Sequence, residues 1–89
     1  MAWKIEFDDA AKKQLANLDK PAAKRITAFL RQRLSQLENP RSLGAALQGA
    51  ELGNYWKYRI GDYRVIAKIN DDKVIVLVLK IGNRKQVYR

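Results

Sequence analysis

The cations Lys57, Arg59 and Arg64 flank the dipeptide Gly61-Asp62, and their side chains are suited to holding a phosphate group. If Gly61-Asp62 forms a two-residue hairpin loop, Arg59 lies opposite Arg64 on the neighbouring strand. Side chains alternate along a strand, so all three cations project from one face of the sheet, together with Lys68. Facing like charges destabilise a sheet by roughly 0.2–1 kcal/mol. Such a conflict is typical of a functional site, so we predict phosphate binding here; solvated surface charges are the alternative.

The elements that must position these cations follow from hydrophobic periodicity. Alternation at Trp3, Ile5 and Phe7 predicts a strand, and three- and four-residue spacing predicts two helices, around 9–18 and 21–37. Three strands then follow at 55–60, 63–70 and 73–81, after a loop at 41–54. The order β-α-α-β-β-β predicts an α+β fold, with a helical hairpin packed on a small, mainly antiparallel sheet.

Aromatic and aliphatic side chains indicate which strand faces are buried. Trp56, Tyr58 and Tyr63 have the opposite parity to Lys57 and Arg59, so we expect them in the core. Every residue from Val74 to Leu79 is apolar. This run predicts a central strand with both faces covered.

Composition narrows the class of protein. The 89 residues suffice for one domain, 1–89, and 18 Lys+Arg against 9 Asp+Glu give a net charge of +9, which is typical of a polyanion binder. An acidic protein partner would also fit. The absence of Cys and His excludes disulfides, thiol nucleophiles and Ser-His-Asp catalysis, and no carboxylates pair as a metal site. Without a long apolar run or a secretory signal, we expect a cytoplasmic protein that does not enter membranes.

The remaining chemistry-bearing side chains are Arg, Lys and Tyr, which suit one reaction class. Cleavage of RNA by its own 2′-OH needs no enzyme nucleophile, but it needs alignment, charge neutralisation and a route for protons. The C-terminal segment adds Arg84, Lys85 and Arg89, together with Tyr88. Tyr88 could stack on a base or move a proton, or it could simply cover a sheet edge.

Three segments resemble the RelE/ParE toxin superfamily. They are Leu47-Gln48-Gly49, the hairpin from Tyr55 to Arg64 with its Gly-Asp-Tyr-Arg motif, and the ending from Gly82 to Tyr88. Together with the order of elements, the resemblance extends over essentially the whole chain. The combination of Lys57, Arg59, Arg64, Arg84 and Tyr88 is similar to the RelE branch, whose members are ribonucleases.

This resemblance implies the toxin of a type II toxin–antitoxin system. Such a toxin is a metal-independent, ribosome-dependent endoribonuclease without a cofactor. It cuts messenger RNA codons in the 30S A site by 2′-OH attack and so inhibits translation. By matching motifs, Lys57 and Arg59 are the paired basic residues, Arg64 holds the scissile phosphate, Arg84 lies near the leaving oxygen, and Tyr88 orients or activates the 2′-OH. These five are the predicted catalytic residues. Predicted RNA- or ribosome-binding residues are Lys68, Lys85, Arg89, Lys24, Arg25 and Arg31.

Two departures from RelE qualify this match. Arg59 stands where RelE often has Lys, and arginine donates protons poorly. If the family transfers a proton at that position, Lys57 or water must do so here. The chain also ends one residue after Tyr88, so we expect no terminal helix.

The resemblance also implies partners, and it leaves two other functions open. We expect a RelB-like antitoxin with an acidic or amphipathic segment, and operator DNA bound only as a complex with it. One alternative is a ParE-like inhibitor of DNA gyrase, which would not need Lys57, Arg59, Arg64 and Tyr88 on one surface. The other is a non-catalytic nucleic-acid-binding module, which would tolerate Arg64→Lys.

Overall fold

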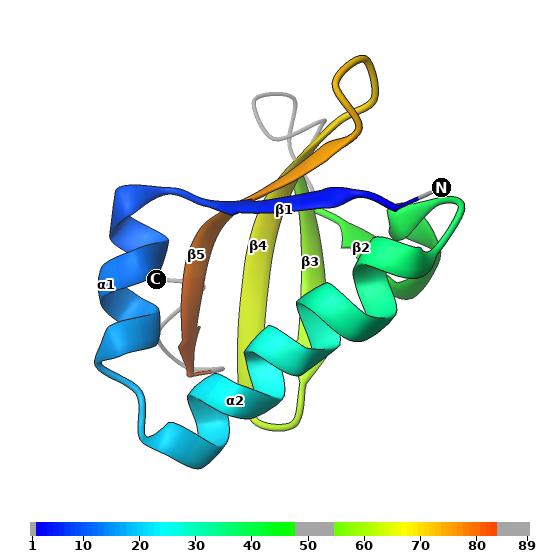
Figure 1. Cartoon of the computed structure of the whole chain (residues 1–89). Helices are drawn as coiled ribbons and strands as arrows, with labels where there is room; N and C mark the ends of the chain where they lie inside the picture. Colours follow the sequence, from blue (N-terminus) through cyan, green and yellow to red (C-terminus); the bar gives the residue numbers. More distant parts are fainter. Residues whose placement is uncertain (1, 48–54, 84–89) are drawn as a thin grey trace.

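The computed structural model describes residues 2–47 and 55–83, in which one five-stranded sheet carries the helices on one face (Figure 1). The spatial strand order is β1-β5-β4-β3-β2. Strand β1 runs parallel to β5 and the other neighbours are antiparallel, which confirms the predicted fold class. The elements are β1 Lys4–Phe7, α1 Asp9–Ala16, α2 Lys20–Ala28, η1 Phe29–Arg33, η2 Leu34–Gln36, η3 Pro40–Leu43, β2 Ala45–Ala46, β3 Tyr55–Ile60, β4 Tyr63–Asn70 and β5 Ile75–Asn83.

The helices begin where the sequence indicates and then depart from regular geometry. Asp8 precedes α1 in an extended conformation, and Pro21 occupies the first turn of α2, where its missing N–H costs nothing. The apolar spacing predicts one helix as far as residue 37, but regular α-helix ends at Ala28. The helix then widens into the π-type turn η1 and tightens into the 3₁₀ turn η2. The Ser35 hydroxyl donates to the carbonyl oxygen of Arg31 at 2.6 Å within this irregular stretch.

The hydrophobic core lies between the helices and the sheet. Tyr58, predicted to be in the core, is 1% exposed, while Trp56 and Tyr63 are half-buried and pack against the buried cluster. The fully buried members come from both layers: Ala11, Ile26, Leu30, Leu34, Val65, Ala67, Val76 and Val78. The face of the sheet away from α1 and α2, called the helix-distal face below, is therefore the one that carries the polar side chains of β3 and β4.

Strand β5 corrects one prediction. It is an inner strand, but only one of its faces is fully buried, because Val76 and Val78 are inaccessible whereas Ile75 and Leu77 are half-exposed on the helix-distal face. The strand also contains a bulge: Ala67 of β4 pairs with Val78, and Ile66 pairs with Lys80. Residue 79 has no partner in β4, so the alternation of faces shifts by one residue after it.

The segment before β3 is held to the sheet by two polar contacts. The Tyr58 hydroxyl donates to the carbonyl oxygen of Pro40 at 2.8 Å, and burial raises the pKa of Tyr58 to about 12. Arg41 donates to both carboxylate oxygens of Asp71, which raises the pKa of Arg41 and lowers that of Asp71, and its guanidinium lies 5.8 Å from the ring centroid of Trp56. Residues 45–46, expected to belong to a loop, then form the short edge strand β2.

Candidate functional site

The predicted hairpin exists with the predicted register. Arg59 pairs with Arg64 and Ile60 with Tyr63 across Gly61-Asp62. Gly61 has a φ of 60°, which glycine adopts without steric cost and which suits the first central residue of a type II′ turn. The two arginines therefore face one another on the helix-distal face, as the sequence predicted.

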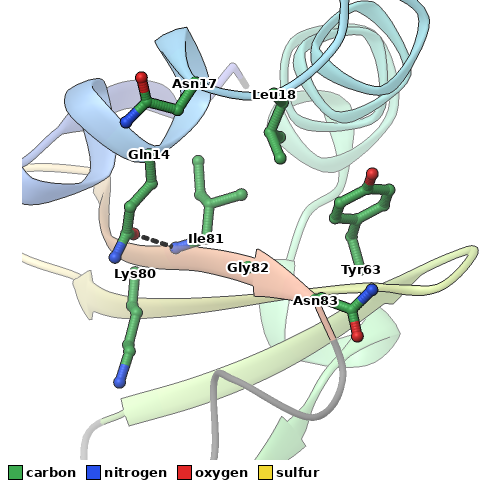
Figure 2. A pocket seen from close by; sticks show the side chains of 8 residues that line it. All are labelled: Gln14, Asn17, Leu18, Tyr63, Lys80, Ile81, Gly82 and Asn83. Carbon is green, nitrogen blue, oxygen red and sulfur yellow. Dashed lines mark hydrogen bonds between the residues drawn. The ribbon is translucent and has the colours of Figure 1, made fainter.

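Two neighbouring rows across the sheet gather four cations. One row is Arg59, Arg64 and Gly82, and the next is Lys57, Ile66 and Lys80. Residues that pair across a sheet share a face, so Lys57, Arg59, Arg64 and Lys80 form one surface, called the basic face below. The side chain of Lys80 lies on the opposite side of β5 from α1 (Figure 2).

Lys80 is the site residue that the sequence did not reveal. Regular alternation from Val76 and Val78 would have placed Lys80 on the buried face. The bulge at Leu79 moves it to the helix-distal face instead. No signal in the sequence marks that bulge, because it depends on how β5 pairs with β4.

Burial and charge distinguish the members of the basic face. Arg64 is only 9% exposed, and its Nη1 donates to the carbonyl oxygen of Tyr63 at 3.2 Å, which fixes the guanidinium against the backbone. Arg59 is exposed. Within residues 2–47 and 55–83, neither arginine forms an ion pair. Among the described residues Arg64 thus has no carboxylate partner, and a nearly buried guanidinium in that state favours an anion supplied by a ligand.

Within the described strands, carboxylates lie away from the basic face, and Asp62 in the hairpin turn forms no ion pair with either arginine in the described part of the chain. The nearest row that contains a carboxylate is Tyr55, Lys68, Leu77 and Glu6, which lies beyond the row of Lys57. Among the described residues, Asp and Glu side chains form no group that could hold a metal ion. The site is therefore built to bind and neutralise a phosphate with guanidinium and ammonium groups.

The other predicted binding residues are only partly brought together. Lys68 lies on the helix-distal face, in the row of Glu6. Arg25 approaches the hairpin turn, since its Nη1 is 3.4 Å from the point where a Cβ of Gly61 would lie. Lys24 and Arg31 belong to the helix layer, where both line a separate shallow hollow on its outer surface and Arg31 lies 6.0 Å from the ring centroid of Phe7. Arg84, Lys85, Tyr88 and Arg89 lie outside the described residues.

Comparison with known proteins identifies the family. A family model described as the ParE toxin of type II toxin–antitoxin systems matches residues 5–88. The chain belongs to this toxin family. It is 29% identical to the mRNA interferase toxin RelE of Escherichia coli K12 over 86 residues, covering 97% of this chain and 87% of that protein. The chain is thus a RelE-like toxin of the RelE/ParE superfamily.

Solved structures agree with this membership. This chain superposes on a chain of the toxin–antitoxin complex RelBE2 of Mycobacterium tuberculosis with a TM-score of 0.85. The two sequences are 25% identical, and the match covers 94% of this chain and 93% of that one. The archaeal RelE–RelB complex of Pyrococcus horikoshii gives a TM-score of 0.75 and 26% identity, covering 98% and 100%. No helix within the described part of this chain is long and apolar enough to cross a membrane.

Proposed function

We propose that this chain is a ribosome-dependent endoribonuclease that cuts messenger RNA in the 30S A site and so stops translation in the cytoplasm. The observation that carries the proposal is the pair Arg59–Arg64. These two arginines lie opposite one another on β3 and β4, with no carboxylate between the two strands. A phosphate between the two guanidinium groups would turn their repulsion into attraction. The relative named mRNA interferase toxin supports the reaction class.

The reaction needs two proton transfers and no metal. The 2′-oxygen of the ribose forms a bond to phosphorus as the bond to the 5′-oxygen breaks, leaving a cyclic phosphate. The 2′-OH loses a proton and the 5′-oxygen gains one. Arg64, already fixed against the Tyr63 carbonyl, is suited to hold the phosphate oxygens where negative charge develops, and Arg59 completes the clamp.

The basic face offers amines for proton transfer, which arginine performs poorly. Lys57 and Lys80 flank Ile66 in the row next to the arginines, so either ammonium group could protonate the leaving 5′-oxygen. The motif match adds Arg84 near that oxygen and Tyr88 beside the 2′-OH. This division of labour predicts that Lys57 and Lys80 act on the chemical step, whereas Arg64 acts on phosphate binding as well.

The proposed partners are an antitoxin, the ribosome and messenger RNA. The similar chains from Mycobacterium tuberculosis and Pyrococcus horikoshii are in toxin–antitoxin complexes, which supports a RelB-like partner. A net charge of +9 favours an antitoxin segment with acidic side chains over the basic face. Operator DNA would be bound by the toxin–antitoxin complex rather than by this chain alone.

A second candidate function is inhibition of DNA gyrase, which the ParE description of the matching family model favours. It is a protein-binding activity and does not require facing arginines. A bacterial cell-free translation assay separates the two functions. The purified chain is added to a translated messenger and to the same messenger without ribosomes, and RNA ends are mapped by primer extension.

We expect new RNA ends inside A-site codons only where ribosomes are present. Ends of equal strength on naked RNA would contradict ribosome dependence. No ends at all, together with loss of supercoiling in a parallel gyrase assay, would replace the nuclease with a gyrase inhibitor.

A further inference from the structure

A cleft lies on the other side of β5 from the basic face. It has a volume of about 470 Å³ and is formed where α1, the α1–α2 turn and the ends of β4 and β5 meet (Figure 2). That volume falls in the range of about 300–1,000 Å³ that is usual for small-molecule sites. The described lining residues used in the argument are Gln14, Asn17, Leu18, Tyr63, Lys80 and Asn83.

The cleft exists because β1 is shorter than its neighbour. Strand β1 pairs with β5 only as far as Val78, so the rest of β5 has a sheet edge that α1 must cover. Gln14 of α1 does so, since its Oε1 accepts a hydrogen bond of 2.6 Å from the backbone N–H of Ile81. The bond closes one end of the cleft and holds α1 at a fixed distance from the strand.

The lining chemistry fits a flat, uncharged ring system. Leu18 reaches down from the α1–α2 turn and the Tyr63 ring rises from β4, which gives an apolar and an aromatic surface (Figure 2). Asn17 and Asn83 supply carboxamides at opposite ends of the cleft. A carboxamide offers a donor and an acceptor in one plane, as recognition of a base edge requires, and single-stranded bases commonly stack on aromatic rings.

Charged ligands fit this cleft less well. Among the described residues, no carboxylate lines the cleft, and the one cationic residue there, Lys80, directs its side chain to the other side of β5 (Figure 2). These residues therefore offer no countercharge to a phosphate or a metal ion in the cleft. The neutral lining contrasts with the basic face, where four cations meet.

Register places the cleft beside the phosphate clamp. Tyr63 pairs with Asn83, and the next pair along the same strands is Arg64 with Gly82. Tyr63 and Arg64 are neighbours with opposite parity, so the clamp and the cleft lie at the same end of the sheet on its two sides. An RNA strand held at Arg64 could pass round the end of β5 and place a nearby base in the cleft.

We infer that the cleft between α1 and β5 binds one unstacked nucleobase of the RNA substrate and thereby biases which sequence is cut. This inference rests on the proposed RNA-cleaving function. Tyr63 and Leu18 would sandwich the base, and Asn17 would read its edge. The basic face, by contrast, would hold any phosphate regardless of sequence.

The test separates base binding from cleavage. ¹⁵N-labelled protein is titrated with each of the four ribonucleoside 5′-monophosphates, and with ribose 5-phosphate as the control that lacks a base. The signal followed is the side-chain amide of Asn17, which lies in the cleft and outside the rows of the basic face. Tyr63→Leu is compared with Tyr63→Phe, which keeps the ring, and Asn17→Leu is compared with Gln32→Leu, which removes a carboxamide from outside the cleft.

The inference expects the Asn17 side-chain amide signal to shift with at least one nucleotide and not with ribose 5-phosphate. Tyr63→Leu should weaken that binding about tenfold, as expected for a lost base–aromatic stack, whereas Tyr63→Phe and Gln32→Leu should retain it. Equal shifts with ribose 5-phosphate would overturn the inference. So would binding that survives both Tyr63→Leu and Asn17→Leu.

The same variants in the cell-free assay connect the cleft to sequence choice. Asn17→Leu should change the relative strengths of the mapped cleavage sites, and Gln32→Leu should leave the wild-type pattern. An unchanged pattern in Asn17→Leu would overturn the role in sequence choice. If wild-type protein cut no RNA, the proposed function would be wrong, yet the titration would still decide whether the cleft binds a base.

Discussion

Replacing Arg59 by glutamine should make the protein more stable while it damages the proposed active site. Directly opposite residues in an antiparallel sheet have Cβ atoms about 4.5–5.5 Å apart, and a like-charged pair there costs roughly 0.2–1 kcal/mol. Arg59 and Arg64 are such a pair. Arg59 is exposed, so glutamine at this position stays solvated and the repulsion alone is removed. We therefore expect the free energy of unfolding to rise by about 0.2–1 kcal/mol.

Denaturant unfolding at two salt concentrations tests this cause. The Debye length is about 10 Å at 0.1 M salt and about 3 Å at 1 M, so the gain should be largely lost at the higher concentration. Lys12→Gln on the exposed side of α1 is the matched control, because it also removes one positive charge from the +9 chain but faces no cation across a strand. Inorganic phosphate should stabilise the wild type more than Arg59→Gln, because the clamp is incomplete in the variant. A loss of stability in Arg59→Gln, or a gain equal to that of Lys12→Gln, would refute the reasoning.

Three further substitutions test the packing around the site by denaturant unfolding. Tyr58→Phe should lower the free energy of unfolding by about 1–2 kcal/mol at neutral pH, because the Pro40 carbonyl loses its hydrogen-bond donor. The pKa of Tyr58 is raised from 10.0 to about 12. The stability difference between wild type and variant should therefore be complete below pH 10 and disappear as the pH rises towards about 12. Gly44→Ala should lower the free energy of unfolding by roughly 1–3 kcal/mol, because the added Cβ would lie 2.8 Å from an atom of the Tyr58 ring. Val74→Gly should stabilise the chain by about 1 kcal/mol, because Val74 has a φ of 56° that β-branched residues rarely adopt; an unchanged or lower stability would contradict strain there.

The hairpin was predictable because local chemistry fixes it. Gly61-Asp62 allows a two-residue turn, and that turn alone sets the register that brings Arg59 opposite Arg64. The alternation of Trp56 and Tyr58 against Lys57 then assigns the two faces. The helices were predictable for a similar reason, since their apolar spacing has to match the buried face of the sheet.

Features that depend on the detailed pairing of a strand with its neighbours could not be predicted. The bulge at Leu79 arises from how β5 pairs with β4, and it decides that Lys80 joins the basic face. The two residues of β2 are too few to give a periodic pattern. The cleft beside Tyr63 exists only because β1 ends before β5 does, which no local signal indicates.

The central claim is that the basic face holds the scissile phosphate, and Arg64→Lys tests it most directly. The substitution keeps the positive charge but removes the planar fork that can hold two phosphate oxygens at once. In the cell-free translation assay, primer extension would compare wild type, Arg64→Lys and the distant charge-conserving control Arg33→Lys. The account predicts strong A-site cuts for wild type and Arg33→Lys and cuts reduced at least about tenfold for Arg64→Lys, which corresponds to the loss of roughly 1.4 kcal/mol of phosphate binding. Cuts of wild-type strength in Arg64→Lys would contradict it, because a non-specific positive surface would then suffice.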